Sequence, residues 1–277
     1  MKDPPEVGQL TPAQIKAAFD KTGKKWALFI GGGEPLLYPD FIKLVNTLKI
    51  NHAIQISTNL FNKNVREFAE RVTPENIINI NASVHILHHS SGSLAKFIQN
   101  YHLYMDKGFD ITVSYVTYPP LFKRMKEDFA YLKSQGIKTI IPLTFQGFFE
   151  GKKYPGSYTS DQVKMILENV HEPLELLITL DRMKFYNRMC RAGSGYFFMD
   201  YRGDVWRCAT IKESCGNLFN GTFSSRPGPA ACPVDQCNDA CFGIISQVEE
   251  PFPPEVEFGA ASEVAETIIE DSHLDGT

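Results

Sequence analysis

Strand-like and helix-like patterns alternate regularly between residues 11 and 170, and this alternation limits the fold more than any other feature of the sequence. Short apolar segments typical of strands lie at 26–30, 53–57, 77–84, 111–116 and 138–143. Segments with helical periodicity lie before, between and after them, at 11–22, 41–48, 65–72, 93–105, 122–133 and 159–169. Strands that alternate with helices of ~10–15 residues form parallel sheets with right-handed crossovers. The sequence therefore predicts an α/β fold built on five parallel strands.

The order of these segments is unusual because the pattern begins with a helix. Thr11, Pro12 and Gln14 form a capping box with a proline in the first turn, which marks a helix start. This helix has no preceding strand from which to cross over. We therefore expect a sheet of strand–helix units whose first strand is missing.

Composition and charge narrow the class of protein. The chain has 277 residues, of which 43% are hydrophobic and 22% charged, and its net charge is −4. This balance is typical of globular proteins and gives no sign of a nucleic-acid partner. The sequence contains no apolar run of the ~18–20 residues that a membrane helix needs, and its polar start does not resemble a signal peptide. We expect a cytoplasmic protein without a membrane or nucleic-acid partner.

Polar residues follow the predicted strands, and the carboxyl ends of parallel strands meet on one rim. Gly31–Pro35 follows the first strand, Ser57–Asn59 the second and Ser83 the third. Glycines let a ligand approach the backbone, and Glu34 with nearby carbonyl groups suits an ammonium group. The small donors at 57–59 suit a carboxylate or ribose hydroxyls. The pattern indicates a site for an amino acid joined to a nucleoside; a tight turn and a helix cap are the alternatives.

The segment Gly32-Gly33-Glu34-Pro35, followed by Leu36-Leu37-Tyr38-Pro39-Asp40-Phe41, resembles the GGEP segment of radical SAM enzymes. Ser57-Thr58-Asn59 resembles the next strand end that contacts S-adenosylmethionine (SAM) in that family, where glycine is more common than Leu60. The resemblance runs from about Gln9 to Gln146. It implies a partial (β/α)6 TIM-like barrel that lacks its first strand. It also implies a SAM site formed by Gly32, Gly33, Glu34, Pro35, Ser57, Thr58, Asn59 and Ser83.

The catalytic motif of that family is missing. Radical SAM enzymes bind a catalytic [4Fe–4S] cluster through CxxxCxxC in the loop after the first strand, upstream of the helix at 11–22. The present sequence has no cysteine before Cys190. Two interpretations follow. Either the chain is truncated at its N-terminus, and the catalytic cluster is expected only with the missing part, or the chain is a degenerate relative that has lost SAM cleavage. We favour truncation because the SAM-contacting segments are intact, and we assign no catalytic residue.

All six cysteines lie between residues 190 and 241. Clustered cysteines in a large chain without an export signal bind metal more often than they form disulfides. Thiolates are ligands for iron–sulfur clusters and for zinc, and a hairpin predicted at 196–208 brings Cys208 beside Cys190. Buried thiols and a structural zinc site are the alternatives to an iron–sulfur cluster.

The spacing of Cys190, Gly203 and Cys208 resembles the start of the SPASM or Twitch extension of radical SAM enzymes, which carries auxiliary [4Fe–4S] clusters. The usual CxxCx5CxxxC ending is reduced here to Cys237-x3-Cys241, with Cys232 at a different spacing. The resemblance therefore implies one auxiliary cluster. Its expected ligands are Cys190, Cys208, Cys237 and Cys241, with Cys232 as an alternative. Cys215 is interpreted equally well as a packed thiol or as a ligand.

Three parts of the chain are expected: a barrel at 1–180, a cysteine-rich domain at 181–245, and an acidic tail at 246–277 with a short helix at 262–270. The segment 151–158 is expected to be a solvated loop.

The resemblance also implies a reaction. A reductant such as flavodoxin or ferredoxin supplies the electron that cleaves SAM to a 5′-deoxyadenosyl radical. This radical then takes a hydrogen atom from the substrate, which is a peptide, a protein or a small metabolite. The alternative function is a non-catalytic docking or electron-relay protein.

Overall fold

The computed structural model describes residues 10–88, 91–170 and 184–237. The chain divides into two compact units. The first unit consists of Met1–Val116 and Lys123–Leu143, and the second consists of Thr117–Phe122 and Thr144–Thr277.

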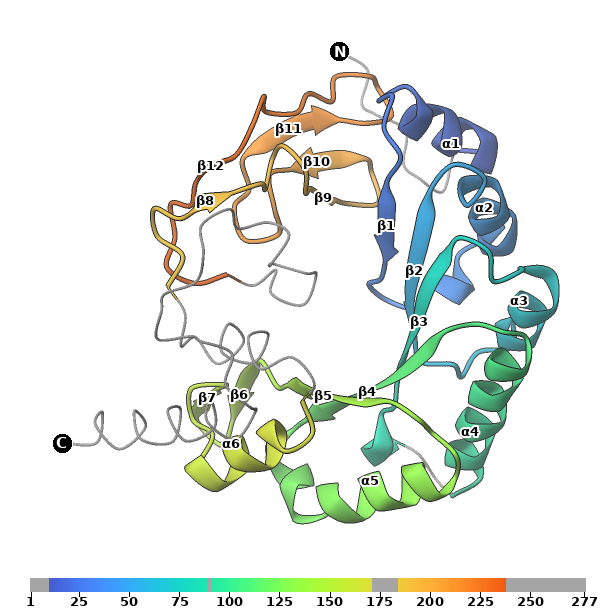
Figure 1. The fold of residues 1–277 in the computed structure, drawn as a ribbon, viewed down its shortest axis with the longest axis vertical. Helices are drawn as coiled ribbons and strands as arrows, with labels where there is room; N and C mark the ends of the chain where they lie inside the picture. Colours follow the sequence, from blue (N-terminus) through green and yellow to red (C-terminus); the bar gives the residue numbers. More distant parts are fainter. Residues whose placement is uncertain (1–9, 89–90, 171–183, 238–277) are drawn as a thin grey trace. The chain divides into compact units, whose positions relative to one another are not determined.

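The first unit is built on a five-stranded sheet with the order β1-β2-β3-β4-β5 (Figure 1). The strands are β1 (Ala27–Ile30), β2 (Ala53–Thr58), β3 (Ile77–Ser83), β4 (Ile111–Thr117) and β5 (Ile140–Thr144). β1 pairs in parallel with β2, β2 with β3 and β3 with β4. The predicted parallel sheet is therefore confirmed, with the chain order of the strands unchanged across the sheet. This order is the one that a partial (β/α) barrel requires.

Helices α1 to α5 lie along one side of this sheet (Figure 1). Their bounds are α1 (Pro12–Asp20), α2 (Phe41–Leu48), α3 (Val65–Arg71), α4 (Ser91–Asp106) and α5 (Met125–Ser134). The capping box at Thr11 and Gln14 is present as predicted. The helix expected from residue 122 begins instead at Met125, because Pro119–Lys123 forms a short 3₁₀ helix, η4. Two successive prolines lack the N–H groups that would extend an α-helix.

The two faces of the sheet differ in chemistry. On the helix-covered face, Ile54 and Ile56 of β2 and Ile80 and Ala82 of β3 are buried in the core. On the other face, polar side chains lie side by side across the strands. The register places Gln55 beside Asn79, Ser57 beside Asn81 and Ser83 beside Ser114. A sheet that is apolar on one face and polar on the other leaves the polar face for a ligand or water rather than for packing.

The second unit contains short helical and strand elements. A hairpin of β6 (Gly147–Phe149) and β7 (Lys152–Tyr154) precedes α6 (Ser160–Leu167), whose predicted capping box at Thr159 is confirmed. The prediction of a solvated loop after residue 150 is wrong for the second strand of this hairpin. Glu150 and Gly151 both have positive φ values, 48° and 74°, which a tight two-residue hairpin turn requires.

The cysteine-rich part forms two further small sheets. β9 (Phe198–Met199) and β10 (Asp204–Trp206) are antiparallel, which confirms the predicted hairpin, and β11 (Ser214–Asn217) pairs with β10 on its other side. β8 (Met189–Cys190) pairs with β12 (Ala230–Ala231). Gly203 has a φ of 82°, and a Cβ atom there would lie 2.2 Å from the Phe219 ring. The glycine of the Cys190…Gly203-x4-Cys208 pattern is therefore required by local packing.

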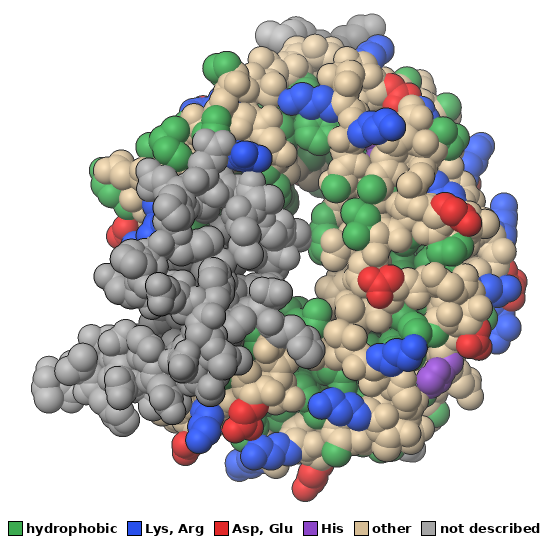
Figure 2. Space-filling model, in the orientation of Figure 1, with side chains coloured by type: hydrophobic (Ala, Val, Ile, Leu, Met, Phe, Trp, Pro, Cys, Tyr) green, Lys and Arg blue, Asp and Glu red, His purple; other side chains and the backbone are tan. Residues whose placement is uncertain are grey.

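Two further findings bear on the sequence-based expectations. Among the described residues, no helix has both the length and the apolar character needed to span a membrane. Lys and Arg side chains are interspersed with Asp and Glu on the described part of the face in Figure 2, without a continuous patch of one sign. The helix expected at 262–270 and the acidic tail lie outside the described residues.

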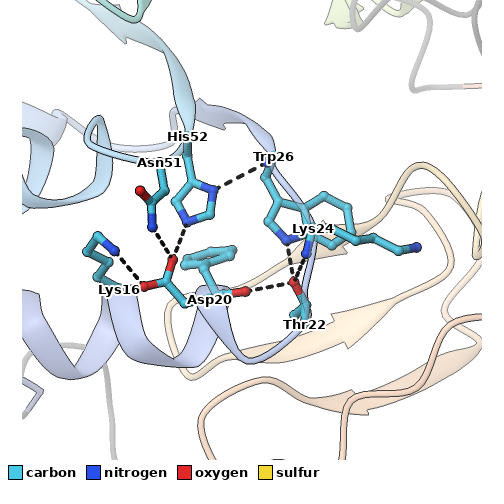
Figure 3. Close-up of polar contacts among 8 residues, drawn as sticks. Lys16, Asp20, Thr22, Lys24, Trp26, Asn51 and His52 are labelled. Atoms are coloured by element: carbon cyan, nitrogen blue, oxygen red, sulfur yellow. Dashed lines mark hydrogen bonds and ion pairs between the residues drawn. The ribbon is translucent and has the colours of Figure 1, made fainter.

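A buried histidine joins three segments of the first unit (Figure 3). His52 is only 2% exposed, and its Nδ1 accepts a hydrogen bond from the backbone N–H of Trp26 at 3.3 Å. Its Nε2 lies 3.4 Å from the Asp20 carboxylate, which also binds Asn51 and Lys16. Burial lowers the pKa of His52, while Asp20 opposes this shift. The neutral ring thus holds the end of α1 and the start of β1 against the turn before β2.

We predict that the first unit loses stability when His52 takes up a proton. The folded-state pKa is lower than the unfolded value of about 6.5, so the contribution of His52 is complete above that pH and is lost as the pH falls below it. The free energy of unfolding should decrease by at most ~1.4 kcal/mol per pH unit, the limit for one proton. Urea denaturation between pH 7.5 and 5 measures this slope.

The variant His52→Gln should be less stable at pH 7 and should show a smaller pH dependence. The exposed His85 provides the matched control, because His85→Gln should keep the slope of the unsubstituted protein. Equal slopes in all three proteins would show that His52 does not determine the pH dependence.

Candidate functional site

The turn after β1 contains three successive glycines, Gly31, Gly32 and Gly33. Gly32 and Gly33 have φ values of 82° and 51°. Apart from the adjacent residues of the turn, no heavy atom of the described residues lies within 4 Å of the position that a Cβ atom would occupy on either. Gly31 is tighter, because its Cβ atom would meet the Phe29 ring at 3.3 Å. Positive φ favours glycine at both positions, and the open space lets another molecule reach the backbone.

Glu34 connects this turn to the end of the neighbouring strand. Its Oε1 accepts a hydrogen bond from the Thr58 hydroxyl at 2.7 Å, and its Oε2 accepts one from the backbone N–H of Asn59 at 2.9 Å. Oε1 also accepts the N–H of Leu36 at 3.3 Å, which caps the 3₁₀ helix η2 (Pro35–Leu37). Pro35 is buried at the start of that helix. One carboxylate therefore fixes the ends of β1 and β2 relative to each other.

The three polar residues after β2 have different surroundings. Thr58 is 3% exposed, and its hydroxyl both donates to Glu34 and accepts from the N–H of Leu60. Asn59 accepts the N–H of Phe61 at its Oδ1, 2.8 Å away. Ser57 is half-buried and lies on the polar face of the sheet, beside Asn81. Of the three, Ser57 has the side chain placed for direct contact with a ligand on that face.

Leu60 has a left-handed backbone, with a φ of 53°. Its side chain is completely buried, its N–H binds the Thr58 hydroxyl, and its carbonyl accepts a 2.8 Å hydrogen bond from the buried Asn100. A glycine would adopt this backbone conformation without strain. No local pattern in the sequence indicates Asn100, which binds from α4 across 40 positions of the chain.

Ser83 ends β3 on the same polar face and pairs in register with Ser114. Ser114 is buried and donates a hydrogen bond to the Asn81 side chain. The structure thus brings Ser57 and Ser83 to one face of adjacent strands, with the Gly32–Gly33 turn at the end of the sheet edge strand. Hydroxyl, amide and backbone groups of this kind suit a polar ligand with both donor and acceptor atoms.

The described cysteines are half-buried or buried in the second unit. Cys190 lies on β8, Cys208 directly follows Arg207 after β10, and Cys232 directly follows β12. Cys237 is the last described residue, and Cys241 lies outside the described residues. Within the described ranges, no group of three or more His, Cys, Asp or Glu side chains lies together as a metal site.

The hydrogen bonds of the sulfur atoms separate the cysteines into two kinds. The sulfur of Cys190 accepts the N–H of Ala192 at 3.4 Å, and that of Cys208 accepts the N–H of Ile211 at 3.2 Å. Backbone N–H groups directed at sulfur stabilise a thiolate and are typical of cluster ligands. The thiol of Cys232 instead donates to the carbonyl of Val234 at 3.5 Å.

Cys215 has the surroundings of a packed thiol. It is buried on β11, its sulfur lies 4.0 Å from the carbonyl oxygen of Glu213, and burial raises its pKa. The nearby Glu213 carboxylate raises that pKa further. Both effects favour the protonated form of this thiol.

Comparison with known proteins gives one family. A sequence profile of the radical SAM superfamily matches residues 2–132. Among curated proteins, none is similar in sequence to this chain. The match covers the turn after β1, the ends of β2 and β3, and helices α1 to α4.

Solved structures have the same fold. A structure of anSMEcpe with bound AdoMet has a TM-score of 0.53 and 15% identity, and the similarity covers 76% of this chain and 68% of anSMEcpe. Another anSMEcpe structure, with AdoMet and the Kp18Cys peptide, has a TM-score of 0.55 at 15% identity over 76% of this chain and 69% of that one. SuiB from Streptococcus suis, bound to the precursor peptide SuiA, has a TM-score of 0.53 at 15% identity over 78% of this chain and 58% of SuiB.

We predict that Glu34→Gln destabilises the first unit. A glutamine has one acceptor oxygen, so either the Thr58 hydroxyl or the Asn59 N–H loses its acceptor, at a cost of about 1–3 kcal/mol. Urea denaturation measures this loss of stability.

The matched control is Glu70→Gln on the exposed surface of α3, where the carboxylate forms an ion pair with Arg66. This substitution should change stability by less than about 0.5 kcal/mol. If the two variants are equally stable, Glu34 does not hold the two strand ends together.

Proposed function

We propose that this chain binds SAM at the carboxyl ends of β1, β2 and β3 and serves radical SAM chemistry on a peptide, because residues 2–132 match the sequence profile of the radical SAM superfamily. The observation that carries the proposal is the open glycine turn, which Glu34 fixes to the end of β2 beside a polar sheet face. The peptide substrate is proposed because anSMEcpe and SuiB, which have this fold, are seen with bound peptides.

Each residue of the site has a proposed role. The backbone of Gly32 and Gly33 receives the methionyl part of SAM, since no side chain among the described residues crowds their Cβ positions. Ser57 and Ser83 offer hydroxyl groups on the polar face for the carboxylate or the ribose. Glu34, Pro35 and Thr58 act by shaping the turn, because Glu34 and Thr58 bind each other and Pro35 is buried. Asn59 supports the same turn through its backbone N–H, which binds Glu34, and its side-chain oxygen, which binds Phe61.

The cysteine-rich part is proposed to hold one auxiliary [4Fe–4S] cluster. The fit rests on Cys190 and Cys208, whose sulfur atoms accept backbone N–H groups, and Cys237 and Cys241 are the proposed remaining ligands. Cys232, whose thiol donates to a carbonyl, is the alternative ligand, and Cys215 is proposed as a packed thiol. When bound, such a cluster carries electrons from a reductant such as flavodoxin or ferredoxin, or binds substrate.

A second candidate function is favoured by one feature of the sequence. The 277 residues contain no CxxxCxxC motif, because the first cysteine is Cys190. A cluster with three cysteine ligands leaves an iron open for SAM, whereas a cluster with four does not. Without such a cluster, the chain would bind partners or relay electrons and would not cleave SAM.

We predict that the 277-residue chain produces no 5′-deoxyadenosine. The test is to reconstitute it without oxygen, add SAM and dithionite, and quantify 5′-deoxyadenosine by chromatography. The same assay is applied to a form that includes any coding sequence upstream of Met1. Multiple turnovers by the 277-residue chain would contradict the prediction. An extended form that contains CxxxCxxC and still makes no product would favour the docking or electron-relay function.

We predict that the cysteines differ in their contribution to the auxiliary cluster. Anaerobically reconstituted protein should hold about four iron and four sulfide per chain, with a broad absorbance near ~400 nm. Cys208→Ala should abolish that absorbance, because its N–H-stabilised sulfur is a ligand. Cys215→Ala should retain it, which provides a matched control on β11, the strand that pairs with the β10 strand before Cys208.

Stoichiometric zinc without iron, found after anaerobic reconstitution, would replace the iron–sulfur proposal with a structural zinc site. Equal loss of absorbance in the two cysteine variants would contradict the distinction between a ligand and a packed thiol.

A further inference from the structure

A buried arginine lies next to the first two proposed cluster ligands in the cysteine-rich part. Arg207 directly precedes Cys208 and is only 3% exposed. Arginine remains charged in proteins, so burial of its guanidinium requires compensation by hydrogen bonds and by negative charge. The hydrogen bonds and ion pairs of Arg207 in the described residues supply only part of this compensation.

The guanidinium joins separate segments that carry cysteines. Its Nη2 donates to the carbonyl oxygens of Ala230 and Ala231 on β12, at 3.2 Å and 3.0 Å. Ala230 pairs directly with Cys190, and Cys232 directly follows Ala231. The side chain that begins beside Cys208 therefore ends on the strand pair that bears Cys190 and leads to Cys232.

The stem of Arg207 lies against the loop that follows Cys190. A Cβ atom on Gly193 would lie 3.3 Å from Cγ of Arg207, so the two segments approach closely only because this residue is glycine. The same loop supplies the Ala192 N–H that binds the sulfur of Cys190. Arg207 thus packs against the segment that directs a hydrogen bond at one of the proposed ligands.

The charge of Arg207 is only partly compensated by the described residues. Its Nη1 lies 3.7 Å from the Glu213 carboxylate, and that carboxylate also accepts a hydrogen bond from Arg226. Glu213 is therefore shared between two guanidinium groups. Nε of Arg207 is buried and has no hydrogen-bond partner among the described residues. A buried N–H donor without an acceptor costs free energy, so this group indicates a missing acceptor.

We propose that Arg207 positions the cysteine segments and supplies positive charge and a hydrogen-bond donor to the anionic auxiliary cluster. This inference rests on the proposed iron–sulfur function of the cysteine-rich part. A cluster bound by four thiolates is an anion, and hydrogen bonds to its sulfur atoms and nearby charge raise its reduction potential. The buried charge of Arg207 therefore favours the reduced state, and its contacts hold Cys190 and Cys208 in register.

The test compares three variants after anaerobic reconstitution. Arg207→Gln removes the charge, and Arg207→Lys keeps the charge but loses the fork of N–H donors. Arg202→Gln is the matched control, because Arg202 lies in the exposed turn between β9 and β10. Iron content is measured first, and the reduction potential is then measured by titration followed by electron paramagnetic resonance.

Arg207→Gln should bind iron less completely or give a cluster with a more negative potential, and Arg207→Lys should lie between it and the unsubstituted protein. Arg202→Gln should match the unsubstituted protein in both measurements. If Arg207→Gln folds, as judged by circular dichroism, and loses iron that Arg207→Lys retains, the proposal is supported.

Unchanged iron content and unchanged potential in both Arg207 variants would overturn the proposal. That outcome leaves the cluster itself intact and so differs from failure of the proposed function. In the latter case the unsubstituted protein would bind no iron.

Discussion

The carboxylate of Glu34 is the interaction on which the candidate SAM site depends. The Gly31–Gly33 turn has no side chains with which to fix its own shape, and glycine has a large conformational entropy to lose on folding. Three hydrogen bonds to one carboxylate offset that cost, and two of them tie the turn to the end of β2. The site therefore combines an open backbone with a rigid attachment, and the rigidity comes from a side chain that points into the protein.

The two parts of the chain are stabilised in different ways. The first unit has a core of aliphatic and aromatic side chains between the sheet and its helices, which include Phe68, Tyr104 and Phe109 in mutual ring contact. The cysteine-rich part has short strands of two to four residues, so few apolar side chains can be buried there. Its order depends on glycine turns, on a buried guanidinium and, in our proposal, on a metal cluster, as is common in small domains.

The sequence predicted the sheet and helices well because several local signals agreed. Apolar periodicity, capping boxes at Thr11 and Thr159 and turn residues all indicated the same elements. The β6–β7 hairpin was missed because each strand has three residues, too few for a periodic pattern. Likewise, the pairing of β8 with β12 joins residues about 40 positions apart and has no local signal.

Site residues were harder to assign than elements, because a residue type does not reveal its partners. Thr58 and Ser57 are adjacent and chemically similar, yet opposite side-chain directions along β2 send one to Glu34 and the other to the polar face. Arg207 was not singled out, since an isolated arginine in a sequence is most often exposed. Only the three-dimensional structure shows that it reaches from the residue before Cys208 to β12, the strand that pairs with Cys190.

The left-handed backbone at Leu60 has a consequence for how this protein can evolve. A glycine there would relieve backbone strain of about 1–2 kcal/mol but would empty a fully buried leucine site, which costs about 2–5 kcal/mol. A change to glycine is therefore unfavourable as a single step unless neighbouring core side chains grow to fill the space. The packing of the core, and not the preference of the backbone, keeps leucine at this position.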